Sequence, residues 1–249
     1  MKNRERGLGN KVQQAMKFKT IKAPTSSNRR HFIKTAIHFA AWLGLLCGPL
    51  FKSVRNAYAK TKRTILPSGT KMSSLVNQNP ASLDTRNLEI TPLNNFETMG
   101  LHDHLVDLNN WRFEVSGNVR KPLNLTYPQL LALPAIERNV LLICPGFFAN
   151  HGRWKGLSVK ELLKISEAPN DITHITFRGP NSRYEKVERF PIADIIADKV
   201  FLAYQVNGKD LPQKHGFPLR TVAEDYFGST WVKYVYKMEA HKFENMQEG

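Results

Sequence analysis

Cysteine is scarce in this chain, which has two in 249 residues, Cys47 and Cys144. No Cys-x-x-Cys pair is present, so the sequence offers no haem-attachment or zinc-ribbon motif. It also contains neither the Gly-x-Gly-x-x-Gly loop of dinucleotide-binding folds nor the Gly-x-Ser-x-Gly turn of serine hydrolases. These absences argue against several common enzyme classes and leave each cysteine needing an explanation of its own.

Long apolar runs are also missing, apart from one near the N-terminus. The stretch from Thr35 to Phe51 is short of the ~20 residues that a membrane span needs. It follows a twin-arginine pattern, Asn28–Lys34, and precedes a small-x-small cleavage site, Ala57–Ala59. Residues 1–59 are therefore predicted to be a twin-arginine signal peptide that directs the folded protein to the periplasm. The alternative is an uncleaved segment that stays as an N-terminal anchor.

Acidic residues are too few to balance the chain, with 21 Asp and Glu against 36 Lys and Arg and a net charge of +15. Residues 1–59 hold twelve of the cations and one acid, Glu5, a net charge of +11. The remainder therefore carries only +4. Since most of the basicity belongs to the predicted signal, the sequence does not indicate a nucleic-acid partner.

The rest of the chain is punctuated by Pro and Gly and reads as short strands with two or three small helices. Residues 60–87 are polar, with little apolar periodicity, and predict an extended or partly disordered arm. Residues 88–249 predict a single domain of the α+β class, mainly β. The patterns predict strands at 111–117, 138–143, 172–177, 200–206, 217–222 and 231–238, and helices at 126–133 and 159–165. Ser158 and Glu161 form the capping-box pattern of the second helix.

Cys144 ends the predicted strand 138–143 and is followed at once by Pro145-Gly146. A thiolate in that position is a soft donor, suited to metals that sulfur ligands favour. Two other interpretations stay open from the residues alone: a small buried core side chain, or a nucleophilic or peroxidatic thiol, which would lack a resolving cysteine. The alternating His102-Asp103-His104 is only a weak metal motif.

Five blocks around Cys144 occur in a recognisable order. They are Asn94-Asn95-Phe96, the strand-end Cys144, Trp154-Lys155-Gly156, Asn207-Gly208 with Leu211-Pro212, and Gly216-Phe217-Pro218-Leu219-Arg220. Together they resemble the sulfite-oxidase-type molybdopterin oxidoreductases, with most similarity to the branch that contains the catalytic subunit of the bacterial periplasmic methionine-sulfoxide reductase. The resemblance implies the sulfite-oxidase-type molybdopterin-binding fold in a single domain and an Mo-molybdopterin cofactor.

Position by position, the resemblance makes Cys144 the catalytic residue and the protein ligand of molybdenum. It places the cofactor-binding positions at Asn94, Glu97, Thr98, Gly179, His215, Arg220, Trp231, Val232 and Lys233. Arginine suits a phosphate through paired donors, and lysine suits it as a point charge. The implied activity is periplasmic oxygen-atom transfer, including the reduction of S-oxides such as methionine sulfoxide.

Several residues depart from that branch of the family. Glu97-Thr98 stands where the branch has Tyr-Glu, His215 where it has asparagine, and the residues after Cys144 also differ. Sulfite-type oxidation and a non-catalytic pterin-binding or electron-transfer accessory therefore remain alternatives. The expected partners are a small-molecule or protein-bound oxidised sulfur substrate and a separate electron-transfer protein, for which the resemblance implies a membrane haem protein. We expect a monomer that does not bind nucleic acid.

Overall fold

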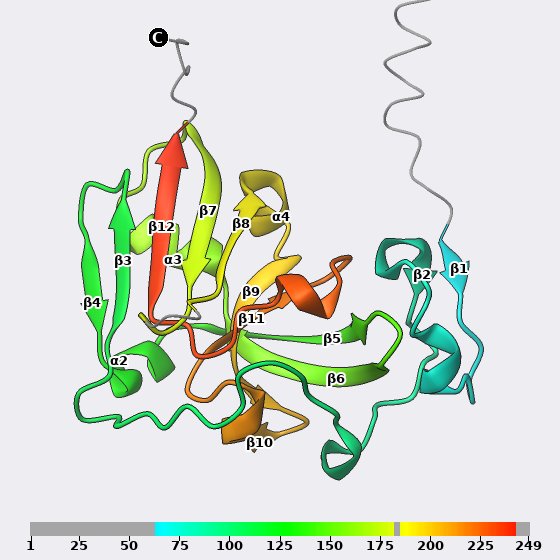
Figure 1. The fold of residues 1–249 in the computed structure, drawn as a ribbon. Helices are drawn as coiled ribbons and strands as arrows, with labels where there is room; N and C mark the ends of the chain where they lie inside the picture. Colours follow the sequence, from blue (N-terminus) through cyan, green and yellow to red (C-terminus); the bar gives the residue numbers. More distant parts are fainter. Residues whose placement is uncertain (1–62, 182–184, 243–249) are drawn as a thin grey trace, which may run out of the picture. The chain divides into compact units, whose positions relative to one another are not determined.

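The computed structural model describes residues 63–181 and 185–242. The predicted signal peptide, its cleavage site and the possible anchor lie outside these ranges. Within them, two five-stranded sheets form the framework (Figure 1), accompanied by short helices. The predicted α+β, mainly β class is confirmed. No helix in the described ranges combines the length and the apolar character needed to cross a membrane.

The first sheet is antiparallel throughout and carries the predicted site cysteine. Its order is β10-β9-β6-β5, with β11 also paired to β9. The bounds are β5 Ala135–Cys144, β6 Phe148–Leu157, β9 Val200–Val206, β10 Lys209–Asp210 and β11 Arg220–Ala223. Since β5 and β6 form a hairpin, the turn between them holds the residues that follow Cys144.

The second sheet has the order β4-β3-β12-β7-β8, in which only β12 and β3 are parallel. Its bounds are β3 Phe113–Gly117, β4 Leu123–Leu125, β7 Ile172–Arg178, β8 Val187–Pro191 and β12 Lys237–Lys242. The α-helices are α2 Tyr127–Leu131, α3 Val159–Ile165 and α4 Ile192–Ile196. The 3-10 helices are η1 Met72–Leu75, η2 Pro80–Ser82, η3 Leu93–Asn95, η4 Gln213–His215 and η5 Gly228–Thr230.

Local sequence patterns account for much of this order. Strand 200–206 and helix 159–165 have the predicted bounds, and α2 carries a capping box in which Thr126 and Gln129 bond reciprocally. Ser158 does not cap α3, because its hydroxyl donates to Asp198 Oδ1 at 2.6 Å instead. The strand expected at 231–238 begins only at Lys237.

The segment before the main domain differs from the extended arm expected there. In the described part, residues 63–87 form β1 Thr64–Ile65, η1, η2 and β2 Leu83–Asp84. Leu66, Leu75 and Leu83 are buried in a cluster with Leu88 and residues of β5 and β6. The four leucines are spaced too irregularly to show a period in the sequence. Their burial against β5 and β6 nevertheless holds the segment on the first sheet. A larger cluster fills the space between the two sheets and the α-helices.

Candidate functional site

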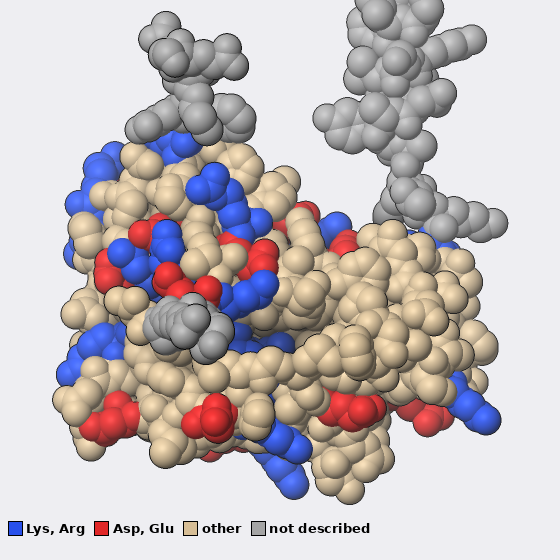
Figure 2. Space-filling model, viewed as in Figure 1, with Lys and Arg blue, Asp and Glu red and all other residues tan. Residues whose placement is uncertain are grey.

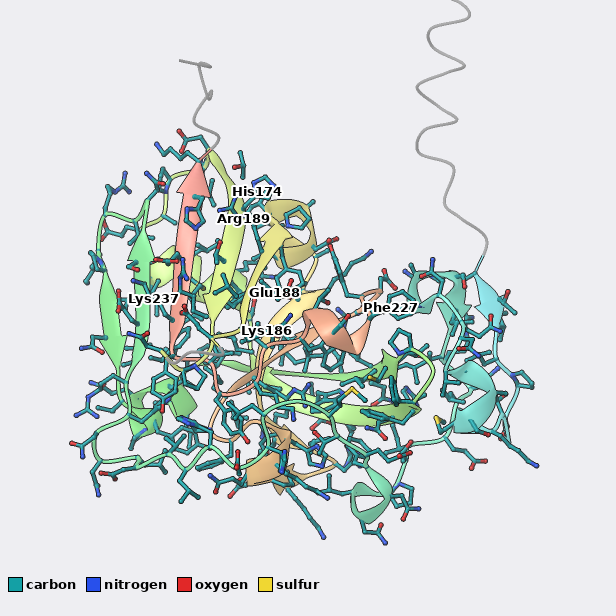
Figure 3. All side chains as sticks on the ribbon, viewed as in Figure 1. His174, Lys186, Glu188, Arg189, Phe227 and Lys237 are labelled. Atoms are coloured by element: carbon teal, nitrogen blue, oxygen red, sulfur yellow. The ribbon has the colours of Figure 1, made fainter. Side chains whose placement is uncertain are left out.

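A cavity of about 590 Å³ opens at the Cys144 end of the first sheet. Its walls combine five parts of the chain: residues 96–103, the β5–β6 hairpin, the segment from η4 to β11, residues 228–234, and Pro180 with Lys186 from the chain between β7 and β8. Figure 2 shows a hollow near the centre of this face, with Lys and Arg side chains beside it. Lys186 also lines the cavity, and its ammonium is ion-paired with the carboxylate of Glu188. Figure 3 labels both residues.

Cys144 presents a half-buried thiol to this cavity. A tight turn follows it, in which Phe147 N donates to Cys144 O at 3.0 Å and Gly146 adopts a positive φ of 77°. The Sγ atom lies 3.8 Å from the thioether sulfur of Met99. Burial raises the pKa of the thiol, and no other cause opposes that shift. The turn therefore presents the sulfur to the cavity rather than hiding it in the core.

The wall formed by residues 97–101 is fixed to β6 by Asn150. This buried amide accepts from Glu97 N at 3.3 Å and donates to Glu97 O at 2.9 Å. Because both amide groups of Asn150 are used on one residue, they set the distance of the loop from the strand. The side chains of Glu97 and Thr98 are among those that line the cavity.

Arg220 is a buried cation, 3% exposed, at the start of β11. Its guanidinium carbon lies 5.0 Å from the ring centroid of Trp154 and 5.2 Å from that of Trp231. Nη1 donates to His215 O at 2.9 Å, and no carboxylate pairs with the guanidinium in residues 63–181 and 185–242. Burial lowers the pKa of Arg220 to about 9. The positive charge is therefore stabilised by ring faces and carbonyls but is not neutralised.

Lys233 supplies a second cation to the same wall. Its ammonium donates to Thr98 Oγ1 at 2.7 Å, Leu101 O at 2.8 Å and Lys214 O at 3.0 Å. None of these oxygens is anionic. Burial, followed by the charge of Arg220, lowers the pKa of Lys233 to about 8. The backbone reaches this position because Gly216 has φ +106° and a Cβ there would lie 2.9 Å from Lys233 Cβ.

His215, 2% exposed, lies at the end of η4 and contributes a neutral ring. Burial, followed by the charges of Arg220, Lys214 and Lys233, lowers its pKa to about 3. Its Nε2 is buried without a hydrogen-bond partner among the described residues. A buried polar atom of this kind normally has a partner, so it marks a place where a bound group would be hydrogen-bonded.

The structure gathers seven of the ten predicted positions on the cavity wall. These are Glu97, Thr98, Cys144, His215, Arg220, Trp231 and Lys233. Asn94 is exposed on η3 and does not line the cavity. Val232 is buried behind the wall, where its backbone pairs with Thr221. Gly179 lies against the Lys233 backbone, since a Cβ on it would stand 3.4 Å from Lys233 O.

Asn150, Lys186 and Tyr234 also line the cavity, although the sequence did not indicate them. Asn150 lies in β6, whose polar and glycine-rich sequence hides its strand character. The Tyr234 hydroxyl is a further buried atom without a hydrogen-bond partner in the described ranges. These three residues become visible only when the strands are assembled.

The donor set fits a metal that arrives on an anionic organic cofactor. The described residues contain no group of three His, Cys, Asp or Glu side chains that could hold an ion, and His102-Asp103-His104 forms none. The cavity offers instead one thiol, two cations that pair with no carboxylate in the described residues, and an imidazole nitrogen without a partner in the same part of the chain. Such a set matches a cofactor that brings its own metal ligands together with a phosphate.

Residues 100–248 match the family described as the oxidoreductase molybdopterin binding domain, and the chain belongs to this family. The prediction of a molybdopterin-dependent oxidoreductase with an Mo-molybdopterin cofactor is confirmed at that level. The match begins at Gly100, so the segment that contains Asn94, Glu97 and Thr98 lies outside it.

Curated relatives agree with the family. The chain is 27% identical over 143 residues to the protein-methionine-sulfoxide reductase catalytic subunit MsrP of Gluconobacter oxydans, covering 51% of this chain and 46% of that protein. It is 26% identical over 159 residues to the NADH nitrate reductase of Lotus japonicus, covering 52% and 18%. The chain thus spans less than half the length of these relatives.

A solved structure is similar in fold. The sulfane dehydrogenase SoxCD of Paracoccus pantotrophus matches with a TM-score of 0.52 and 22% identity, over 55% of this chain and 40% of that one. The predicted sulfite-oxidase-type fold is thereby confirmed.

Proposed function

We propose that this protein is a periplasmic molybdenum oxidoreductase that transfers an oxygen atom at sulfur, reducing S-oxides such as methionine sulfoxide. The observation that carries the proposal is one cavity that joins the Cys144 thiol with a buried arginine and a half-buried lysine, which both lack carboxylate partners in the described residues. The likeness to a methionine-sulfoxide reductase subunit supports the substrate class.

Each wall residue has a proposed role toward the cofactor. Cys144 is the protein ligand of molybdenum, since its thiol is the sulfur donor on the wall that a soft metal prefers. Arg220 and Lys233 bind the phosphate, whose charge would neutralise both cations. His215 Nε2 hydrogen-bonds a polar edge of the pterin. The remaining predicted binding positions are Asn94, Glu97, Thr98, Gly179, Trp231 and Val232. Of these, Asn94, Gly179 and Val232 do not line the cavity and would act by setting the backbone conformation of the wall.

When bound, the cofactor supplies the redox chemistry and the exchange of oxygen with substrate. The chain supplies position and exclusion of water. Phe96, Phe148 and Trp154 are buried side chains on the wall and keep it apolar around the sulfur of Cys144. His215 stays neutral at physiological pH, so it can act as a hydrogen-bond donor or acceptor without adding charge.

The proposal includes export and an electron partner. Export by the twin-arginine route is supported by Asn28–Lys34 and Ala57–Ala59 in the sequence, which lie outside the described residues. Arg29→Lys together with Arg30→Lys should keep the protein in the cytoplasmic fraction, whereas wild type appears in the periplasmic fraction. We propose a separate redox protein, such as a membrane haem protein, as the source of electrons. We also propose that the protein acts as a monomer.

Metal and pterin analysis of the full chain tests the central proposal. After expression in a host that makes molybdopterin, wild type should contain close to one molybdenum per chain. Cys144→Ser should lose activity and keep the fold, whereas Cys47→Ser is the matched control that leaves both unchanged. A wild-type protein without molybdenum and pterin would contradict the proposal.

Sulfite-type oxidation is the second candidate, because His215 departs from the methionine-sulfoxide branch and lies on the cavity wall. Turnover of S-oxides, N-oxides and sulfite with artificial electron carriers separates the two. A loaded protein that turns over none of them would indicate the accessory role.

A further inference from the structure

The strand that ends at Cys144 is buried on two faces although it lies at the edge of its sheet. In the order β10-β9-β6-β5, the strand β5 pairs on one side only. Val140 and Leu142 point into the main core, whereas Leu141 and Ile143 belong to the second cluster. Successive side chains of a strand point to opposite faces, so something must cover each face of β5 near Cys144.

The cover on the second face comes from residues 63–88, which we name the N-terminal strap. It contributes Leu66, Leu75, Leu83 and Leu88 to the cluster that holds Leu141, Ile143 and Ala149. Figure 1 shows β1 and β2 of this strap beside the arrowhead of β5, the end at which Cys144 lies. Phe227, labelled in Figure 3, packs against the same cluster from the chain just before η5.

Polar contacts fix the strap at its start and at the turn that follows Cys144. Arg63 Nη2 lies 2.7 Å from Asp225 Oδ2, and Arg63 Nη1 donates to Leu83 O at 3.4 Å. Val76 O accepts from Gly146 N at 3.1 Å. The last bond matters most for the site, because it holds the glycine two residues beyond the thiol.

The chain beyond the strap is fastened to β6 as well. Thr91 N donates to His151 O at 2.8 Å, and His151 N donates to Thr91 Oγ1 at 3.0 Å. His151 Nδ1 lies 3.1 Å from Glu89 O. A displacement of the strap would therefore be transmitted to both strands of the hairpin, not only to its turn.

We propose that the strap positions Cys144 in the cavity, with Leu75 and Val76 as the positioning residues. Leu75 is buried in the cluster that supports Ile143, the residue before the cysteine, and the carbonyl of Val76 holds the turn after it. The strap precedes residues 100–248, so this role falls on a segment outside the matched domain. The inference rests on the proposed function insofar as the position of the sulfur matters for ligating molybdenum.

Thiol reactivity tests the strap without any cofactor. In the full chain with Cys47→Ser, Cys144 is the only thiol, and its rate of reaction with a maleimide is measured in cofactor-free protein. Leu75→Ala should raise this rate about tenfold, because the hairpin end opens locally more often. Leu75→Met fills the space again and should restore a rate within about twofold of the parent.

A matched control separates positioning from loss of stability. Leu130 is a leucine as buried as Leu75, but it lies on α2 in the main core. Leu130→Ala should destabilise the protein to unfolding and leave the maleimide rate of the folded protein unchanged. Equal rates for Leu75→Ala and Leu130→Ala would overturn the proposal, as would no change in either. If Leu75→Ala does not fold, Leu75→Val is compared with Leu130→Val and the same outcomes decide.

A spectroscopic measurement extends the test to loaded protein. The electron paramagnetic resonance signal of pentavalent molybdenum should shift in Leu75→Ala and not in Leu130→Ala, since only the first moves the sulfur. Identical signals in both variants would refute a role in ligand position. If wild type held no molybdenum, the proposed function would fail while the maleimide rates still decided the role of the strap.

Discussion

Replacing Arg220 with methionine should change the stability of the cofactor-free and the loaded protein in opposite directions. The guanidinium is 3% exposed and has no carboxylate partner in the described part of the chain. In the cofactor-free protein its charge is therefore only partly compensated. In the loaded protein, the proposed phosphate would complete the pair.

The magnitude follows from the burial of the charge. Lowering the pKa of Arg220 from 12.5 to about 9 corresponds to roughly 5 kcal/mol of unfavourable interaction of the charged form. Contacts with Trp154 and Trp231 offset about 0.5 to 2 kcal/mol each. The hydrogen bond to His215 O is worth about 1 kcal/mol more. We therefore expect Arg220→Met to stabilise the cofactor-free protein by about 2 kcal/mol.

Thermal unfolding of both forms measures this effect. For a domain of this size, about 2 kcal/mol corresponds to a rise in Tm of about 4 to 8 °C. In loaded protein the same substitution leaves the cofactor anion without its partner, and a loss of about 3 to 5 kcal/mol is expected. Cofactor-free protein can be made in a host that does not synthesise molybdopterin.

Arg138→Met is the matched control. Arg138 Nη2 lies 2.6 Å from Glu224 Oε2, so this arginine is already paired within the protein. Its replacement should lower Tm in both forms by similar amounts. If Arg220→Met lowered Tm in the cofactor-free protein as much as in the loaded one, the charge of Arg220 would be fully compensated without a ligand, and the argument for an anion at this place would be wrong.

Three further predictions concern the other wall residues. The folded-state pKa of His215, about 3, lies below its unfolded value of 6.5, so the unfolded chain takes up a proton first and stability is lost as pH falls below 6.5. Urea unfolding should show a loss of about 2 kcal/mol at pH 5. The same loss should be absent in His215→Gln. Lys233 has a pKa of about 8, so its ammonium loses its charge between pH 7 and pH 9, and cofactor retention during dialysis should weaken over that range. Lys233→Met should retain less cofactor and show no such pH dependence. Asn150→Leu removes both hydrogen bonds to Glu97, so the free energy of unfolding should fall by about 2 kcal/mol and the cofactor occupancy should also fall. Calorimetry measures the first effect and metal analysis the second. Asn95→Ala, at an exposed position, should change neither quantity.

The strands that could be predicted are those in which local pattern and final environment agree. Strand β9, Val200–Val206, is apolar and buried almost throughout, and a turn at Asn207-Gly208 follows it. Strand β6, Phe148–Leu157, could not be predicted from its polar and glycine-rich sequence. It is a strand because β5 and β9 pair with it on both sides, and Gly156 allows the Leu202 backbone to approach.

The site was predictable to a similar extent. Cys144 could be identified because an apolar strand ends there, and Arg220 because it closes a recognisable block. Asn94 belongs to such a block as well, yet its exposed side chain on η3 does not line the cavity. Spacing along the chain does not indicate which side of a short 3-10 helix will face the wall.

Four features could be read directly from the residues: the number of thiols, the charge of the N-terminal segment, the mainly β class and the place of Cys144 at a strand end. These are local properties, set by residue type and by the period of apolar side chains. Three features depend on the assembled fold: Arg220 packs against the rings of both Trp154 and Trp231, His215 Nε2 has no partner in the described residues, and the strap covers β5. Each of these depends on residues far apart in the chain, and their contacts arise from packing that no local pattern encodes.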